Sequence, residues 1–261
     1  DSSLQAATLV AIDEATTGKV TAIAATTLTG MTSDVLFAVT STGITLNGSE
    51  AITLEDTGTV AAEDLIAIDD KTATVVDASL VTEISGAATA IAHALTSHTI
   101  SFSGAEAVRL TETSLGAATL RAIDDETSAT IDATSLTLLT GVAQDVASVM
   151  LASGITLNGS EEVTLDAGTA TAGDLLTING STTAALVDAT AVTEVTGDAS
   201  MIAEALTSAG GDPFEIVRYV RRKATAATTT STGLVARWSL SWASRAAGLP
   251  ATCPSAAMRT S

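Results

Sequence analysis

The chain has few of the residues from which large globular cores and cross-linked folds are usually built. It contains one cysteine, three prolines and only 2% aromatic residues among 261. The lone Cys253 excludes an internal disulfide framework and a metal site built from cysteines. Because aromatic rings bury so much surface each, their scarcity argues against an ordinary core of this size. The composition instead favours thin layers of Ala, Thr, Val, Leu and Ile.

Basic residues are scarce in the first four-fifths of the chain. Residues 1–210 contain Lys19, Lys71, Arg109 and Arg121 against 28 acidic residues, a net charge of -24. Such a surface repels nucleic acid and anionic membranes, so we expect neither as a partner. No apolar run reaches the roughly 18–20 residues that span a bilayer, which predicts that there is no transmembrane segment. The start at Asp1, without Met or an apolar leader, indicates a fragment or a processed product.

What the sequence has in abundance is internal repetition. The segment GITLNGSE at Gly43–Glu50 returns at Gly154–Glu161, and a degenerate copy, TISFSGAE, lies between them at Thr99–Glu106. Self-similarity at a fixed spacing of about 55 residues is the signature of a stacked repeat architecture. The same spacing separates four isoleucines at one helical position: Ile12, Ile68, Ile123 and Ile178.

Each repeat divides into two related halves of about 27 residues. Residues 61–69 and 88–96 combine helix formers with apolar residues at helical spacing, whereas residues 73–84 are β-branched and partly alternating. The elementary coil is therefore a short helix, a strand, a corner and a strand. For residues 1–210 this predicts an α/β repeat solenoid of seven to eight coils with parallel sheets. The alternative is a pure parallel β-solenoid in which the helical segments are irregular turns.

The pattern stops in the middle of a coil, at Gly210. Residues 211–261 hold all three prolines, both tryptophans, and seven basic residues against Asp212 and Glu215. Three interpretations of this atypical basic tail stay open. It is a cap that closes the last coil, a basic segment for anionic partners, or disordered or out-of-frame sequence.

Acidic pairs recur at equivalent positions near the ends of the predicted helices. Asp69-Asp70 and Asp124-Asp125 follow the pair Asp13-Glu14 at the repeat spacing. Oxygen ligands stacked at coil ends suit calcium, so Asp69, Asp70, Asp124 and Asp125 are the candidate metal ligands. The competing interpretation is that these residues end helices and face water, because adjacent carboxylates lack the spacing of a calcium-binding loop. The sequence suggests no other cofactor.

Other polar residues recur at the predicted corners and strands. Asp77, Asp132 and Asp188 are expected to bond the local backbone in Asx turns. Asn47 and Asn158 precede corner glycines, where a positive φ is easily adopted. Three glutamates follow the corners and are expected to cap neighbouring amides, with cation binding as the alternative: Glu50, Glu106 and Glu161. Recurrent strand threonines favour plain β propensity over an ice-binding ladder.

No catalytic constellation is present in the sequence. His93 and His98 are the only histidines, and they occur in one copy without a repeated partner. No Walker loop, Gly-x-Ser-x-Gly elbow or dinucleotide fingerprint is found. We therefore expect a protein without enzymatic activity.

The repeats resemble those of a known class of proteins. The segments that carry the resemblance are Asp64–Asp69, Val76–Ser79, Leu28–Gly30 and Gly154–Leu165. They resemble the Ala/Thr-rich tandem repeats of very large, type I-secreted, calcium-associated (RTX-like) bacterial surface and adhesin-like proteins. The resemblance implies an extracellular or cell-surface location, a spacer or adhesive role, and other surface-layer or matrix components as partners. The alternative is a module that binds calcium, glycan or ice through equivalent loops or strand faces.

Overall fold

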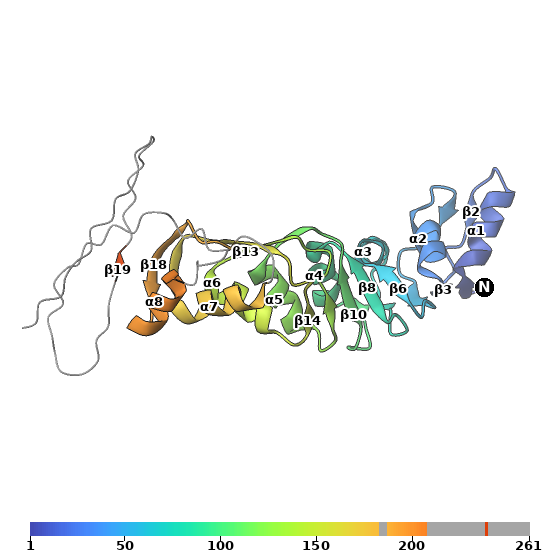
Figure 1. Ribbon diagram of the computed structural model, residues 1–261. Coiled ribbons are helices and arrows are strands. Elements are labelled where there is room, and N and C mark those ends of the chain that lie inside the picture. The colour runs from blue at the N-terminus through green and yellow to red at the C-terminus, as the bar shows by residue number, and fades with distance from the viewer. Residues whose placement is uncertain (183–186, 208–237, 240–261) are drawn as a thin grey trace, which may run out of the picture.

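Short helices and short strands alternate along an elongated body in the computed structural model, which describes residues 1–182, 187–207 and 238–239 (Figure 1). The helices within these residues are α1 (Ala6–Ala15), α2 (Thr32–Thr40), α3 (Ala62–Asp69), α4 (Ala88–Thr96), α5 (Ala117–Glu126), α6 (Ala143–Leu151), α7 (Ala172–Ser181) and α8 (Ala199–Thr207). Each helix packs on the next one in the chain. None of them has the length and apolar composition to cross a membrane.

The strands are two to five residues long and pair across neighbouring turns of the chain. They are β1 (Ser3–Gln5), β2 (Val20–Thr21), β3 (Thr27–Gly30), β4 (Ile44–Thr45), β5 (Ala51–Leu54), β6 (Thr59–Ala61), β7 (Val76–Asp77), β8 (Glu83–Gly86), β9 (Ile100–Ser101), β10 (Ala107–Leu110), β11 (Ser114–Gly116), β12 (Ile131–Asp132), β13 (Leu138–Gly141), β14 (Ile155–Thr156), β15 (Glu162–Leu165), β16 (Gly168–Thr171), β17 (Val187–Asp188), β18 (Val192–Thr196) and β19 (Trp238–Ser239). The sheet orders are β1-β3-β5-β7-β9, β14-β12-β10-β8-β6, β11-β13-β15-β17, β16-β18-β19 and β2-β4.

Every described strand pair except β18–β19 is parallel, and the pairing advances by a nearly constant step along the chain. Leu4 pairs with Leu28, and Val60 pairs with Ile84, so the residue numbers of partners differ by 24. The step shortens by one between Val108 and Ile131, and it lengthens by one after a bulge in β16–β18. Alternating helices and parallel strands confirm the α/β repeat class. They also show that the pure parallel β alternative is wrong, because the predicted helical segments are true helices.

The two halves of a repeat are less alike than the sequence predicts. We call the stretch from an odd-numbered helix to the next even-numbered one an odd half, for example residues 62–87, and the rest of the repeat an even half, for example residues 88–116. Within a repeat, equivalent strands pair: β7 with β9 and β8 with β10. Because the full repeat is longer than two of these pairing steps, each even half adds an extra strand, β6, β11 or β16. The prediction of two equal halves is therefore wrong for the strands.

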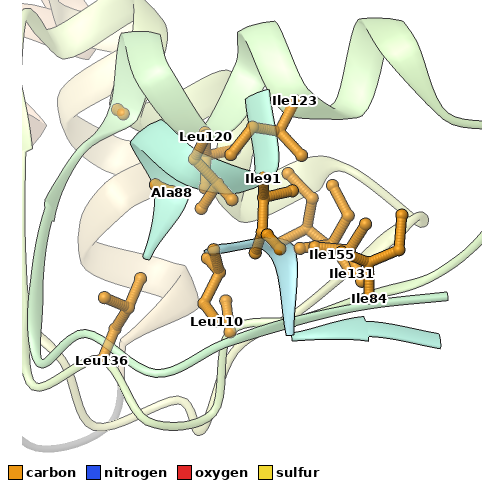
Figure 2. Packing of buried hydrophobic residues seen from close by; sticks show 14 of the residues in the cluster. Ile84, Ala88, Ile91, Leu110, Leu120, Ile123, Ile131, Leu136 and Ile155 are labelled. Atoms are coloured by element: carbon orange, nitrogen blue, oxygen red, sulfur yellow. The ribbon is translucent and has the colours of Figure 1, made fainter. Parts of the chain in front are cut away.

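The interior is a stack of small aliphatic side chains. In the sheet from β6 to β14, one column of paired residues is buried throughout: Val60, Ile84, Val108, Ile131 and Ile155. Each helix adds residues at three-residue spacing, as in Ala117, Leu120 and Ile123 of α5. Figure 2 shows Leu120 and Ile123 facing the strand residues. This layering explains how a chain with so few aromatic rings still excludes water from its core.

The predicted basic tail, residues 211–261, lies outside the described residues apart from β19. That strand runs antiparallel along β18, with Val195 opposite Trp238. A short part of the tail thus lies on the edge of the last sheet.

Candidate functional site: the recurrent polar corners

The even corners, which connect β4 to β5 and β14 to β15, are built around a buried carboxylate. Glu50 is 2% exposed and accepts the N–H of Asn47 at 2.7 Å. Glu161 is 1% exposed and accepts the N–H groups of Asn158 at 2.5 Å and Gly159 at 3.1 Å. Buried carboxylates are stable only when they are paired or hydrogen-bonded. The prediction that these glutamates cap nearby amides is confirmed.

The third copy of this corner follows the same plan. Glu106, also 2% exposed, accepts the N–H groups of Ser103 at 2.5 Å and Gly104 at 3.0 Å. Gly48, Gly104 and Gly159 have φ values of 75°, 86° and 78°. Only glycine adopts this region without steric cost, so the corner glycines shape the loop that surrounds the carboxylate.

The asparagine of the even corner reaches the preceding turn of the chain. The Nδ2 of Asn47 donates to the carbonyls of Ile23 at 3.0 Å and Ala25 at 2.8 Å. Its Oδ1 accepts the N–H of Ser49 at 2.8 Å. The sequence predicted a corner residue here, but it did not predict a cross-link between segments 22 to 24 residues apart.

The cross-link recurs in the other asparagine copy. Asn158 donates to the carbonyls of Thr134 at 3.2 Å and Leu136 at 2.7 Å. On the other side of the corner, the backbone carbonyl of Glu50 accepts the hydroxyls of Thr72 at 2.7 Å and Thr74 at 2.5 Å. At the Asn158 corner, the hydroxyl of Thr182 likewise donates to the carbonyl of Glu161 at 3.3 Å. The two asparagine corners are thereby tied both to the preceding and to the following part of the stack.

The odd corners use a local device. The Oδ1 of Asp77 accepts the N–H of Ser79 at 3.0 Å, and that of Asp188 accepts the N–H of Thr190 at 2.9 Å. These bonds confirm the predicted Asx turns. Asp132 accepts both the N–H and the hydroxyl of Thr134, at 3.0 and 2.6 Å. These hydrogen bonds, the hydroxyl first, outweigh partial desolvation and, with a smaller contribution from Arg109, lower the pKa of the Asp132 carboxyl.

The four predicted calcium ligands lie at helix ends and do not converge. Asp69 and Asp70 stand at and just after the end of α3, and Asp124 and Asp125 lie in the last turn of α5. The Oδ2 of Asp69 accepts the hydroxyls of Ser97 at 3.1 Å and Thr99 at 2.8 Å. Asp70 and Asp125 are exposed. Within the described residues, no group of three or more His, Cys, Asp or Glu side chains is placed to hold a metal ion. Calcium binding by these residues remains a prediction.

A pairing between the helix-end aspartates and the following loop was missed by the sequence reasoning. The carboxylate of Asp13 accepts the hydroxyl of Ser41 at 3.0 Å, and it occupies the position that a Cβ on Gly43 would take. A Cβ on Gly154 would lie 2.8 Å from the Oδ1 of Asp124. In the middle copy, Thr99 takes the glycine position and donates its hydroxyl to Asp69 instead. The signal in the sequence was the alternation of Gly, Thr and Gly opposite a constant aspartate.

The outward strand residues do not form a long threonine surface. Thr29 pairs with Thr53, but the next residue in the row is Asp77. Thr140 pairs with Thr164, and Asp188 follows. In the neighbouring sheet Arg109 forms an ion pair with Glu83 at 2.7 Å. Each threonine row therefore ends after two residues, which favours β propensity as the reason for the threonines.

Comparisons with known proteins identify no relative. No family model matches the chain, no curated protein matches it, and no solved structure matches its fold. The function therefore has to be inferred from the arrangement of the chain itself.

Proposed function

We propose that residues 1–210 form an α/β solenoid that serves as a non-enzymatic spacer or adhesive segment of a large secreted bacterial surface protein. The observation that carries this proposal is the role of the recurrent polar residues. Glu50, Glu106 and Glu161 hold their own corners, Asn47 and Asn158 join neighbouring turns, and the odd-corner aspartates bond local amides. Side chains engaged in this way maintain an elongated stack (Figure 1).

The solenoid arrangement is supported by nearest-neighbour packing. Helices contact the next helix along the chain, and strands pair with the equivalent strands one turn away. A stack of this kind gains length by adding units and does not need to enlarge a single core. Length combined with an acidic surface suits a segment that holds other parts of a secreted protein away from a cell.

Removing one whole repeat tests the solenoid. Deletion of residues 62–116 joins Ala61 to Ala117, which is the equivalent of Ala62, and so preserves the register. We expect a folded protein whose longest dimension, measured by small-angle X-ray scattering, falls by about 10 Å or more, since parallel strands lie about 4.8 Å apart. The matched control deletes residues 62–101, which joins the end of β6 to the even corner that follows β9. The solenoid is contradicted if the in-register deletion unfolds the chain as fully as this control.

Calcium separates the spacer from the binding module. We expect the melting temperature of the full chain to be the same, within about 2 °C, in calcium and in EDTA, because only a ligand of the native state would raise it. A rise of many degrees in calcium would show such a ligand and would overturn the inert spacer. In that event, changing Asp69, Asp70, Asp124 and Asp125 to Asn would abolish the rise if these residues are the ligands.

A further inference from the structure

The first turn of the stack exposes residues that every later turn buries. Ile12 of α1 is 47% exposed, whereas its equivalents Ile68, Ile123 and Ile178 are all 0% exposed. Val20 of β2 is half-buried, but Val76, at the equivalent position of β7, is fully buried. The later copies serve as internal controls, because each compared pair has the same amino acid at the equivalent position of the equivalent helix or strand. The difference therefore lies in what covers the surface.

An even half covers each of the later odd halves. Helix α2 packs on α3, and β5 pairs with β7; α4 packs on α5, and β10 pairs with β12. Among the described residues α1 has a helix on one side only, and β2 pairs with β4 alone. The surface at Ile12 and Val20 continues the interface that the chain forms between its own repeats.

The backbone at β2 has the same hydrogen-bonding pattern as the equivalent interior strands, in which a carbonyl accepts a bond from the strand of the preceding even half. The N–H of Ile52 donates to the carbonyl of Val75 at 3.2 Å, and the N–H of Val108 donates to the carbonyl of Thr130 at 3.0 Å. The equivalent carbonyl in the first repeat is that of Lys19, to which no described residue donates. On its other side β2 is satisfied, because the N–H of Val20 donates to the carbonyl of Gly43 at 2.8 Å. The carbonyl of Lys19 beside the apolar side chain of Val20 is therefore placed to pair with one more parallel strand.

We propose that Ile12, Val20 and the free edge of β2 form an interaction surface for one more even half of this repeat type, docked in parallel register. The partner is a helix, strand, corner and strand of the kind in residues 32–54. Its helix packs on α1 as α2 packs on α3, and its second strand pairs with β2 as β5 pairs with β7. The inference rests on the proposed stacking of repeats and adds the identity of a partner to it.

Thiol labelling of a cysteine at position 12, on the exposed surface formed by Ile12 and Val20, tests the inference in the full chain. All variants carry Cys253→Ser. A copy of residues 87–111 is placed ahead of Asp1, which restores the register because Asp1 is the equivalent of Glu112. We expect Ile12→Cys to react with a thiol reagent at least tenfold more slowly in the extended chain than in the original chain. The control extension changes the residues equivalent to Ile91, Ile100 and Val108 to Asn and should leave the reaction fast.

The outcomes separate the inference from the proposed stacking. Ile68→Cys in the original chain should be protected; rapid labelling there would contradict the stack itself. If Ile68→Cys is protected but Ile12→Cys reacts equally fast with and without the extension, the docking surface is refuted. If Ile12→Cys in the original chain becomes protected as protein concentration rises, with a dimer in sedimentation, while the extended chain at low concentration reacts as fast as the original, the occupant is a second copy and the even-half proposal is wrong.

Discussion

The odd and even corners turn the chain through similar bends by different means. At an odd corner the aspartate bonds an amide two residues ahead, as Asp77 does with Ser79. At an even corner a buried glutamate organises the loop, and Asn47 or Asn158 reaches the odd corner 22 to 24 residues earlier. The odd-corner aspartate thus bonds only its own turn, although Ser135 of one odd corner also donates to the carbonyls of Leu110 and Glu112. The even-corner asparagine itself joins two turns of the stack. We infer that the even-corner asparagines add to the cohesion between turns wherever they occur.

The strand ends differ in a complementary way. The last strand of an odd half ends in a glycine, and each glycine pairs with a buried leucine of the even half. The pairs are Gly30 with Leu54, Gly86 with Leu110 and Gly141 with Leu165. The glycines have φ values of 152°, 150° and 145°. A Cβ on Gly30 would lie 3.1 Å from the Cβ of Ala6, the first residue of the preceding odd helix. Small and large residues therefore alternate along the stack, and the two halves cannot replace each other.

The largest expected effect comes from removing an even-corner carboxylate. Glu161→Ala removes the buried carboxylate that accepts the N–H groups of Asn158 and Gly159, which should lower the free energy of unfolding by about 2–4 kcal/mol. Urea denaturation measures the change. The matched control is Glu162→Ala at the neighbouring exposed residue, expected within about 0.5 kcal/mol of the parent. Equal losses for the two variants would refute the structural role of the buried carboxylate.

The next largest loss of stability is expected from replacing a glycine at the end of an odd-half strand. Gly141 has a φ of 145°, and a Cβ there would lie 3.4 Å from the Cβ of Ala117. Gly141→Ala forces a side chain into this backbone region, so we expect a loss of about 1–3 kcal/mol in the free energy of unfolding. Gly58 has no atom within 4 Å of a built Cβ. Gly58→Ala should therefore be neutral or slightly stabilising. A neutral Gly141→Ala would show that the odd strand end tolerates a side chain.

Local features of the repeat were predictable from the sequence because they follow from short-range chemistry. Helices over residues 62–69 and 88–96, the Asx turns of Asp77 and Asp188, and the capping by Glu50 depend on residues only a few positions apart. Apolar spacing and turn chemistry are visible at that range.

Contacts between turns were not predictable in the same way. The pairing step of the strand ladders depends on where each short strand begins, and two steps of 24 residues do not add up to the repeat period. The reach of Asn47 to the carbonyls of Ile23 and Ala25 depends on that step. For the candidate calcium site, the sequence placed the aspartates at helix ends correctly, but adjacency in the chain does not determine whether carboxylates from different turns converge.

The asparagine cross-link should have a smaller effect on the free energy of unfolding, and it can be tested both by removing it and by adding it. Asn158→Ala removes two bonds to the carbonyls of Thr134 and Leu136, which should lower the free energy of unfolding by about 1–2 kcal/mol. Ser103 occupies the equivalent position in the degenerate copy. Ser103→Asn should restore the cross-link and add about 0.5–1 kcal/mol. Urea denaturation measures both variants. If Ser103→Asn is neutral while Asn158→Ala destabilises, the asparagine cross-link does not explain the difference between the copies.

The smallest effect is expected at an odd corner, through the titration of Asp132. Its pKa is lowered first by the hydroxyl of Thr134, then by the N–H of Thr134, and least by Arg109. Because the folded-state pKa lies below the unfolded value of about 3.9, the carboxylate contributes stability above that value and loses it as pH falls through the folded pKa. In an NMR titration, Thr134→Ala should raise the pKa of Asp132 toward its ordinary value, and Arg109→Ala should raise it less. A larger rise with Arg109→Ala would mean that this corner also depends on the neighbouring strand, and the contrast between local odd corners and cross-linking even corners would be weakened.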